Sequence, residues 1–235
     1  MSLIQHNEFN FKRISVLAGH YGSGKTNIAV NFALHRKENE NDITIADLDI
    51  VNPYYRTKDS ADLLSKQGIT LVSSEYANTN VDVPALPAAI YDSVVDGSRG
   101  LLIDVGGDDR GALALGRYSG YIREENNYDM FFVINMYRPL TRNAGDTLDV
   151  FREVEAASGL KFSGIINNSN LGPLTTADDV TNSAEYAAEV CELTKLPLFA
   201  TTVSDNIFEE CKARDIIIRP FPLSLQRNRI WLSGN

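Results

Sequence analysis

The segment Leu17–Thr26, LAGHYGSGKT, contains residues whose types and spacing suit the binding of a phosphate group. Gly19, Gly24, Lys25 and Thr26 follow the pattern of a glycine, four residues, a glycine, a lysine and a threonine. Glycines leave the backbone N–H groups open to wrap a polyphosphate, a lysine places positive charge on the terminal phosphates, and a threonine hydroxyl binds magnesium. The sequence therefore predicts a nucleotide-binding loop.

We expect the whole loop to contact the nucleotide, because loops of this kind hold phosphate through consecutive N–H groups and the start of the following helix. Lys25 is also a predicted catalytic residue, since its charge would lie on the β- and γ-phosphates. His20 could contact a ligand or a partner, or could be a neutral ring packed over the loop. The predicted nucleotide-binding residues of this segment are Gly19, His20, Tyr21, Gly22, Ser23, Gly24, Lys25, Thr26 and Asn27.

Acidic residues follow two further apolar runs. The run LLIDVGG places Asp104 at the end of a predicted strand, and IADLD places Asp47 and Asp49 at the end of another. Carboxylates in such places can hold Mg²⁺ through water, so we predict a magnesium site at Thr26, Asp47 and Asp104. Asp49 is the predicted catalytic residue that orients the attacking water. The alternative is that these acids only begin polar turns.

Three neighbouring features carry weaker predictions. Gly106 and Gly107 would let the backbone pass close to a terminal phosphate. Asp108 or Asp109 could cap a helix that begins there. The segment 52–56, NPYYR, is either a mobile segment that a partner protein recognises or a packed turn.

Polar residues at later strand ends suggest contacts with the base and with phosphate charge. The run FSGIINN ends in Asn167 and Asn168, and a side-chain amide offers the donor and acceptor that suit the edge of adenine. We predict Asn168 as the base contact, with a polar strand end as the alternative. Arg110, Arg138 and Arg142 could each stabilise phosphate charge, although an arginine at the surface is the commoner outcome.

These residues must be positioned by alternating strands and helices. Because the apolar runs are apolar throughout, we expect strands that are covered on both faces. The pattern predicts one α/β domain over residues 1–235, with a mostly parallel, twisted sheet between two layers of helices and its ligand at the carboxyl ends of the strands. The expected strands span 13–18, 42–49, 69–74, 100–107, 128–135, 162–168 and 196–203, and the expected helices span 26–39, 85–96, 142–157 and 177–194.

Composition argues against several partners. The formal net charge of −9 disfavours a broad basic surface, so we expect neither nucleic acid nor an anionic membrane as a partner. No apolar run approaches the length of a membrane helix, and the first residues lack the features of a signal peptide. Cys191 and Cys211 form no CxxC motif, which disfavours an iron–sulfur cluster and fits a cytoplasmic protein.

Taken in order, GHYGSGKT, DLD, LLIDVGGD and GIINNSN resemble the MinD/ParA/Mrp/NifH class of P-loop ATPases, also called the CobQ/CobB/MinD/ParA nucleotide-binding domain. The resemblance runs from Ile14 to about Asp205. It implies a three-layer P-loop fold, ATP (or ADP) and Mg²⁺ as ligands, and a homodimer with nucleotide at its interface. The residue roles that it implies are phosphate binding at Gly22–Thr26, Mg²⁺ near Thr26, a water-positioning acid at Asp49, a Walker B acid at Asp104 and an adenine contact at Asn168.

The chain departs from that class at His20. The resemblance implies a lysine there, which reaches across the dimer to the partner's phosphates. An imidazole is shorter and mostly neutral near pH 7, so either an arginine replaces that lysine or dimer-coupled hydrolysis is weak or absent. We therefore expect an ATP-binding protein, a slow Mg²⁺-dependent ATPase that serves as a nucleotide switch for an unidentified protein partner. The alternatives are an ATP-dependent amidoligase or carboxylase-type synthase of the same fold, and a nucleotide-binding scaffold without turnover.

Overall fold

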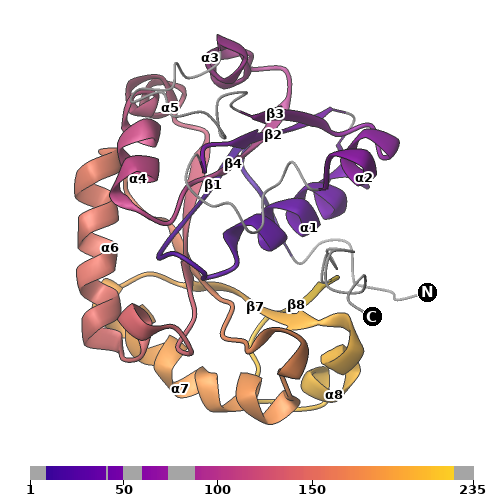
Figure 1. Cartoon of the computed structure of the whole chain (residues 1–235), viewed down its shortest axis with the longest axis vertical. Helices are drawn as coiled ribbons and strands as arrows, with labels where there is room; N and C mark the ends of the chain where they lie inside the picture. Colours follow the sequence, from indigo (N-terminus) through magenta and orange to yellow (C-terminus); the bar gives the residue numbers. More distant parts are fainter. Residues whose placement is uncertain (1–8, 41, 50–59, 74–87, 225–235) are drawn as a thin grey trace, which may run out of the picture.

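One parallel sheet of eight strands runs through the centre of the molecule (Figure 1). The computed structural model of the chain describes residues 9–40, 42–49, 60–73 and 88–224. The strand order is β3-β2-β4-β1-β5-β6-β7-β8, so β1, which precedes the glycine-rich loop, lies in the middle. The strands are β1 Ile14–Ala18, β2 Ile43–Asp47, β3 Thr70–Ser73, β4 Gly100–Asp104, β5 Tyr128–Ile134, β6 Gly164–Asn167, β7 Leu198–Ser204 and β8 Pro220–Leu223.

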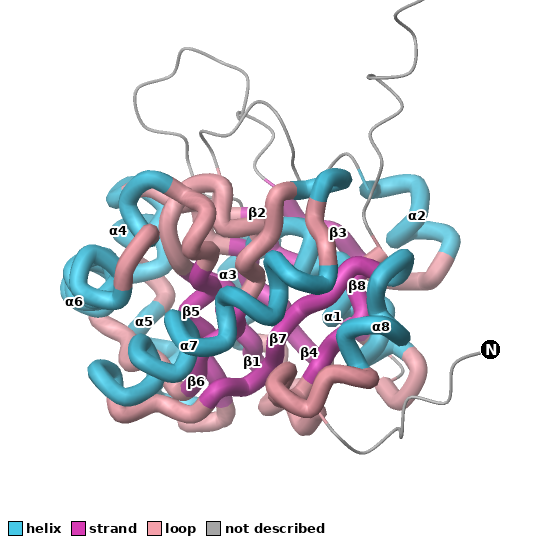
Figure 2. Tube along the Cα trace, turned by 90° about the horizontal axis from the view of Figure 1, so that it is seen from below, coloured by secondary structure: helices cyan, strands magenta, loops and turns pink. Residues whose placement is uncertain are grey.

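Helices cover both faces of this sheet (Figures 1 and 2). The side chains of α1 and α2 share one core cluster with the sheet, and those of α3 to α7 share the other. The short α8 packs against β7, β8 and α7. The helices are α1 Lys25–Lys37, α2 Ala61–Lys66, α3 Ala88–Val95, α4 Asp109–Gly116, α5 Ser119–Glu125, α6 Ala144–Ser158, α7 Ala177–Thr194 and α8 Phe208–Lys212, with 3₁₀ turns η2 Pro139–Thr141, η3 Gly172–Leu174 and η4 Asp205–Ile207.

The apolar strands explain this layering. In β5, Met130, Phe132 and Ile134 point into one core cluster, whereas Phe131 and Val133 point into the other. Successive side chains of a strand alternate between faces, so a strand that is apolar throughout must bury both faces. The predicted fold class, a parallel sheet between two layers of helices, is confirmed.

The structure also contains elements that the periodicity did not predict. The strand β8 has the sequence PFPL, and its two prolines lack the N–H group that a strand uses for pairing. It pairs with β7 and stands last in the strand order, a place where proline is tolerated in sheets. The short helices α2, α5 and α8 were not expected either, because five to seven residues carry little periodicity.

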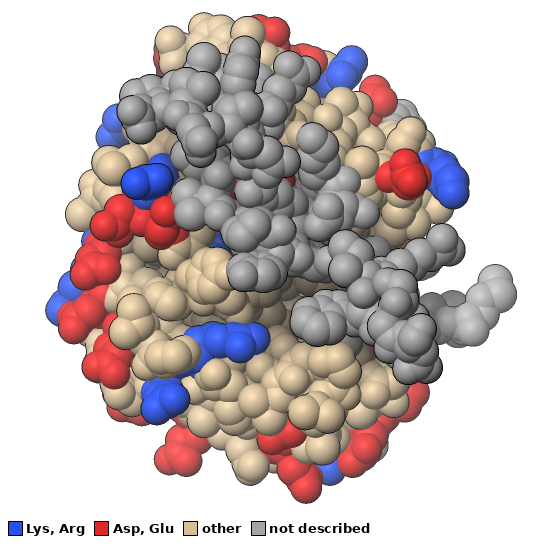
Figure 3. Space-filling view, in the orientation of Figure 1, with Lys and Arg blue, Asp and Glu red and all other residues tan. Residues whose placement is uncertain are grey.

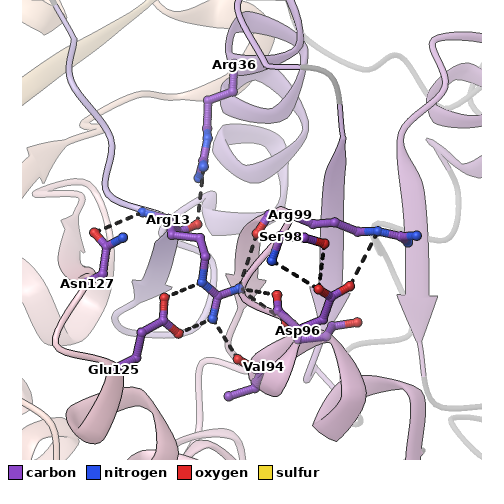
Figure 4. Close-up of polar contacts among 9 residues, drawn as sticks. Arg13, Arg36, Val94, Asp96, Ser98, Arg99, Glu125 and Asn127 are labelled. Atoms are coloured by element: carbon purple, nitrogen blue, oxygen red, sulfur yellow. Dashed lines mark hydrogen bonds and ion pairs between the residues drawn. The ribbon is translucent and has the colours of Figure 1, made fainter.

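The amino ends of the central strands are tied together by Arg13, which directly precedes β1 (Figure 4). Its guanidinium group pairs with the carboxylate of Glu125 at the end of α5. The same group donates hydrogen bonds to the carbonyl oxygens of Val94 at 2.6 Å, Asp96 at 3.0 Å and Arg99 at 3.2 Å. One side chain therefore joins the end of α3, the start of β4 and the end of α5.

Arg36 of α1 extends this network to the other layer of helices. It forms an ion pair with Glu40 and donates to the hydroxyl of Ser15 at 3.1 Å and to the carbonyl of Arg13 at 3.2 Å. Both arginine side chains are almost fully buried. The amino edge of the sheet is thus held by buried charge pairs, and the loops at the carboxyl edge are left for other contacts.

Charges on the surface are mixed. On the face seen in Figure 3, acidic side chains gather along one rim, and basic side chains are interspersed with them. None of the helices within the described ranges is long and apolar enough to cross a lipid bilayer.

We predict that Arg13→Ala lowers the free energy of unfolding by about 3 kcal/mol, because it leaves a partly buried carboxylate and several carbonyl oxygens without their donor. The matched control is Lys12→Ala, which removes a neighbouring exposed cation whose contact with Asp129 is at the surface. Urea unfolding of the three proteins measures the difference. A loss below about 1 kcal/mol for Arg13→Ala, as expected for a surface ion pair, would contradict the structural role.

Candidate functional site

The glycine-rich loop joins β1 to α1 and is shaped by close backbone contacts. Gly24, the residue before α1, has a φ of 93°, and a side chain there would meet the amide of Asn168. A Cβ at Gly19 would lie 2.4 Å from the carbonyl oxygen of Val133 in the adjacent strand β5. Real Cβ atoms do not approach other atoms so closely, so both positions require glycine.

A pocket of roughly 210 Å³ opens between the loop and the ends of neighbouring strands. The start of α1 faces this pocket, and the first N–H groups of a helix have no partner within the helix. Those N–H groups and the helix dipole favour an anion at this position. The lining residues are Tyr21, Gly22, Gly24, Lys25, Thr26, Asn27, Asp49 and Gly107.

Lys25 is the buried cation of the pocket. Its side chain folds back over the loop, and Nζ donates to the carbonyl oxygens of Gly19 at 3.0 Å and His20 at 3.1 Å. Burial lowers the pKa of Lys25, and the carboxylates of Asp104 and Asp49 oppose this shift. The amino group is therefore held by neutral carbonyls at a place where an anion would be a better partner.

Two predicted magnesium ligands lie beside each other at the ends of adjacent strands. Asp47 of β2 and Asp104 of β4 are register partners, and both are buried. The carboxylate of Asp47 accepts a hydrogen bond of 2.9 Å from the N–H of Asp49, which holds Asp49 at the rim of the pocket. Thr26 stands at the start of α1 in the same pocket. The structure therefore brings the predicted metal ligands Thr26, Asp47 and Asp104 close to Asp49, the residue predicted to orient the attacking water.

This set of ligands fits a magnesium ion that is bound together with a nucleotide. In the described part of the chain, no group of three or more histidine, cysteine, aspartate or glutamate side chains could hold a metal alone. Mg²⁺ takes one or two carboxylates and completes its octahedron with water and phosphate oxygens. The paired acids and the nearby hydroxyl supply the protein part of such a site.

The segment after β4 touches the glycine-rich loop directly. A Cβ at Gly107 would lie 2.5 Å from the N and Cα atoms of Tyr21 and 3.0 Å from the Nζ atom of Lys25. The side chain of Asp108 then caps α4 by accepting from the N–H of Gly111 at 3.0 Å, which confirms one of the two predicted caps. A ligand that moves the loop would therefore press on the start of α4.

Asn168 lies under the loop and is buried. Its Nδ2 donates to the carbonyl oxygen of Ser23 at 2.5 Å, and its Oδ1 accepts from the hydroxyl of Thr202 at 2.5 Å. Both ends of the amide are used within the protein, so this residue supports the loop. The predicted contact with adenine stays a prediction, and it would use the second lone pair of Oδ1 or the second hydrogen of Nδ2.

A small hollow of roughly 10 Å³, about the room for one water molecule, adjoins Asn168 at the ends of β6 and β7. Thr202, which sequence reasoning missed, lies in its wall, and only its place near the end of an apolar strand could have indicated it. The hollow contains no carboxylate, and its lining residues are Asn168, Asn170, Gly172, Thr175, Val180, Thr202, Ser204 and Leu223.

His20 packs on its own loop. Its Nδ1 lies 2.9 Å from the carbonyl oxygen of Tyr21, and the ring is partly buried. Burial lowers the pKa of His20 and Lys25 lowers it further, against the opposing effects of the Tyr21 carbonyl and Glu153. The lowered pKa favours the neutral form of the ring. Tyr21 is half exposed beside it.

The three candidate arginines have different surroundings. Arg138 donates from Nε to the carbonyl oxygen of Gly22 at 2.9 Å, so it reaches the glycine-rich loop from the segment after β5. Arg110 and Arg142 are exposed. The segment 52–56 lies outside the described residues.

Comparison with known proteins shows likeness in structure but not in sequence. No protein-family model matches the chain, and a search of curated proteins finds no match. Among solved structures, the chain is similar to FtsY from Mycoplasma mycoides, with a TM-score of 0.56, 18% identity, and coverage of 84% of this chain and 63% of that one. It is also similar to FtsY, a cell division protein, from Thermotoga maritima, with a TM-score of 0.54, 17% identity, and coverage of 82% and 61%.

A third similar structure is the signal recognition particle 54 kDa protein from Aeropyrum pernix in complex with GDP, with a TM-score of 0.53, 16% identity, and coverage of 84% of this chain and 42% of that one. The chain thus spans less than two thirds of the length of each of these proteins. At such identities the likeness concerns the fold alone. The chain shares the three-layer α/β fold of these proteins.

Proposed function

We propose that this protein is a nucleotide-binding switch, a slow Mg²⁺-dependent ATPase whose bound nucleotide controls contact with a protein partner. One observation carries the proposal. Lys25, the start of α1 and Asp49 line one pocket beside a glycine-rich loop, and the buried register partners Asp47 and Asp104 stand at adjacent strand ends, with the charge of Asp104 acting on Lys25. A buried amino group, unpaired helix N–H groups and paired carboxylates together suit a magnesium-bound polyphosphate.

In this proposal each residue has a separate task in hydrolysis. The N–H groups of the loop and of α1 hold the phosphates, and Lys25 turns from the carbonyls of Gly19 and His20 to the β- and γ-phosphates. Bound Mg²⁺ would neutralise the developing phosphate charge, held by Thr26 and, through water, by Asp47 and Asp104. Asp49, at the rim of the pocket, orients the attacking water.

The contact between Gly107 and Tyr21 supports a switch. A terminal phosphate beside Lys25 would lie next to Gly107, whose backbone is so close to the loop that a Cβ there would lie 2.5 Å from the N and Cα atoms of Tyr21. Gly107 leads within two residues into α4, and α4 packs on α6. Gain or loss of that phosphate can therefore shift α4. In many nucleotide switches a segment changes its order or position in this way when the terminal phosphate is gained or lost.

The exposed apolar side chains support a protein partner and a homodimer of the MinD/ParA type. Leu113 of α4, Leu140 of η2 and Leu174 of η3 are 59%, 56% and 80% exposed. They belong to the segments that follow β4, β5 and β6. Exposed apolar side chains in these segments are candidates for contact with a partner.

The residue types around Asn168 support adenine rather than guanine. Guanine presents an N1–H and an amino group that a carboxylate usually accepts, and none of the residues that line the small hollow beside Asn168 is an acid. The segment Asn167–Leu171, NNSNL, likewise contains no acid. Of the similar structures, the particle protein from Aeropyrum pernix was solved with GDP, but the likeness of fold does not extend to its ligand.

We predict that the wild-type protein binds ATP with Mg²⁺ and dimerises when it does, and that Lys25→Ala stays folded but binds ATP about ten- to a hundredfold more weakly. Loss of one charge-assisted contact of this kind costs about 1.5–3 kcal/mol. Calorimetry gives the affinities, and sedimentation gives the oligomeric state. The control is Lys161→Ala, which removes an exposed lysine far along the chain. Equal affinities of the Lys25→Ala and wild-type proteins would contradict the assignment of the pocket.

We further predict that ATP binds more tightly than GTP, since the described residues that line the hollow beside Asn168 include no acid that could accept from guanine. Competition against a fluorescent nucleotide measures both affinities, and ITP, which lacks the 2-amino group, is the control. GTP binding that is tenfold tighter than ATP binding would overturn the choice of base.

His20→Ala is predicted to leave the hydrolysis rate within a few-fold of wild type from about pH 5.5 to about 8.5, because a ring that is neutral at pH 7 supplies no charge to phosphate. A nearby phosphate would raise the pKa of His20, so a catalytic imidazolium would instead give a rate that rises as the pH falls. Steady-state rates of both proteins across this range decide between these outcomes. A loss beyond about a hundredfold in the variant, about 2.7 kcal/mol of barrier, would make His20 catalytic.

A further inference from the structure

The carbonyl oxygens of the glycine-rich loop are all engaged. From Gly19 to Ser23, each successive carbonyl accepts a hydrogen bond within the protein. The carbonyls of Gly19 and His20 accept from Lys25, which lines the pocket, whereas the next three carbonyls accept from side chains that do not line it. The arrangement therefore holds the carbonyls of Tyr21, Gly22 and Ser23 toward donors outside the place where an anion would bind. The donors are Lys25 to the first two carbonyls, the ring of His20 to the third, Arg138 to the fourth and Asn168 to the fifth.

The donor to Gly22 comes from far along the chain. Arg138 stands just after β5, and its Nε lies 2.9 Å from the carbonyl oxygen of Gly22, 116 residues away in sequence. The backbone of Gly22 has a φ of 75°, and a Cβ built there would lie 3.5 Å from the same Nε. The guanidinium group thus packs against the loop at the point where the loop backbone turns through the left-handed region.

Arg138 differs from Lys25 in what happens when an anion arrives. The Nζ atom of Lys25 must leave its carbonyls to reach a phosphate, so its bonds hold the loop only before binding. The hydrogen bond from Arg138 is accepted by the carbonyl oxygen of Gly22 and uses none of the N–H groups of the loop. Arg138 itself does not line the pocket. The bond can therefore persist while phosphate occupies the N–H groups on the other side.

We propose that Arg138 is a positioning residue for the phosphates: its Nε holds the Gly22 carbonyl outside the pocket, so that the N–H groups of the loop stay turned inward in both the free and the bound protein. This inference rests on the proposed nucleotide binding and deepens it. It also gives the loop a fixed shape that does not depend on His20. Holding donors in place before binding removes the cost of ordering them afterwards.

The first test needs no nucleotide. Hydrogen exchange of the free protein is measured for wild type, Arg138→Ala and the control Arg142→Ala, which removes an exposed arginine from the same connection. We expect faster exchange of the Ser23 amide, which donates to the carbonyl oxygen of His20 at 3.2 Å within the loop, in Arg138→Ala alone, with the rest of the sheet unchanged. Unchanged exchange of this amide would overturn the proposal. This arm stands even if the protein binds no nucleotide, so its failure is separate from failure of the proposed function.

The second test measures affinity for ADP and for a non-hydrolysable ATP analogue. We expect Arg138→Ala to weaken both by the same factor, about ten- to a hundredfold, because the cradle is shared by both ligands. Arg138→Lys should remain weak, since a lysine keeps the charge but lacks the planar guanidinium, and added guanidinium ion should restore Arg138→Ala. Full recovery in Arg138→Lys would show that charge alone matters, and a loss confined to the ATP analogue would show direct contact with the last phosphate; either result overturns a positioning role.

Discussion

The burial of one amino group, that of Lys25, is the constraint on which the rest of the site depends. A charged group that leaves water must be paired or hydrogen-bonded, or its charged form becomes unfavourable. Here burial does lower the pKa of Lys25, while two backbone carbonyls and nearby carboxylates, with Asp104 foremost, limit the effect. Each of these partners is supplied by the loop itself or by an adjacent strand end. A different loop shape or strand order would leave the amino group without them.

The strand order explains how those partners come together. Because β4 lies between β1 and β2, Asp104 is a register partner both of Leu17, close to the loop, and of Asp47. On the other side, β5 and then β6 follow β1, and the segments after them carry Arg138 and Asn168 to the loop. Acids thus approach the loop from one side and hydrogen-bond donors from the other. The result is a polarised site, and in the proposed function a metal and a terminal phosphate would lie on its β4 side.

Much of this could be predicted from the sequence, because the strongest signals are local. The apolar runs predicted seven of the eight strands in the described part of the chain. Strands that are covered on both faces are apolar throughout, so each appears in the sequence as an uninterrupted apolar run. The spacing of Gly24, Lys25 and Thr26 likewise located the loop and the start of α1. The strand β8 was missed because its prolines read as a loop, and only its pairing with β7 makes it a strand.

The weaker predictions concern side chains whose partners are distant in sequence. Nothing local distinguishes Arg138 from Arg142, yet one reaches Gly22 and the other is exposed. Asn168 was assigned to a base on the chemistry of its amide, and the fold shows that the amide already has two partners, Ser23 and Thr202. An amide or a guanidinium group can donate hydrogen bonds equally well to a ligand and to a backbone carbonyl. Only the register of strands far apart in sequence decides which of these it meets.

The same reasoning explains why the site suits a switch better than a tight permanent binder. Before binding, Lys25 is bonded to the carbonyls of Gly19 and His20, and Gly107 lies against the backbone of Tyr21. A phosphate must displace the amino group from those carbonyls and find room beside Gly107. Part of the attraction between lysine and phosphate is therefore used to break existing hydrogen bonds, which lowers the net affinity. In the proposed function, a nucleotide held in this way would be exchangeable, and its arrival and departure would act on the backbone that leads into α4.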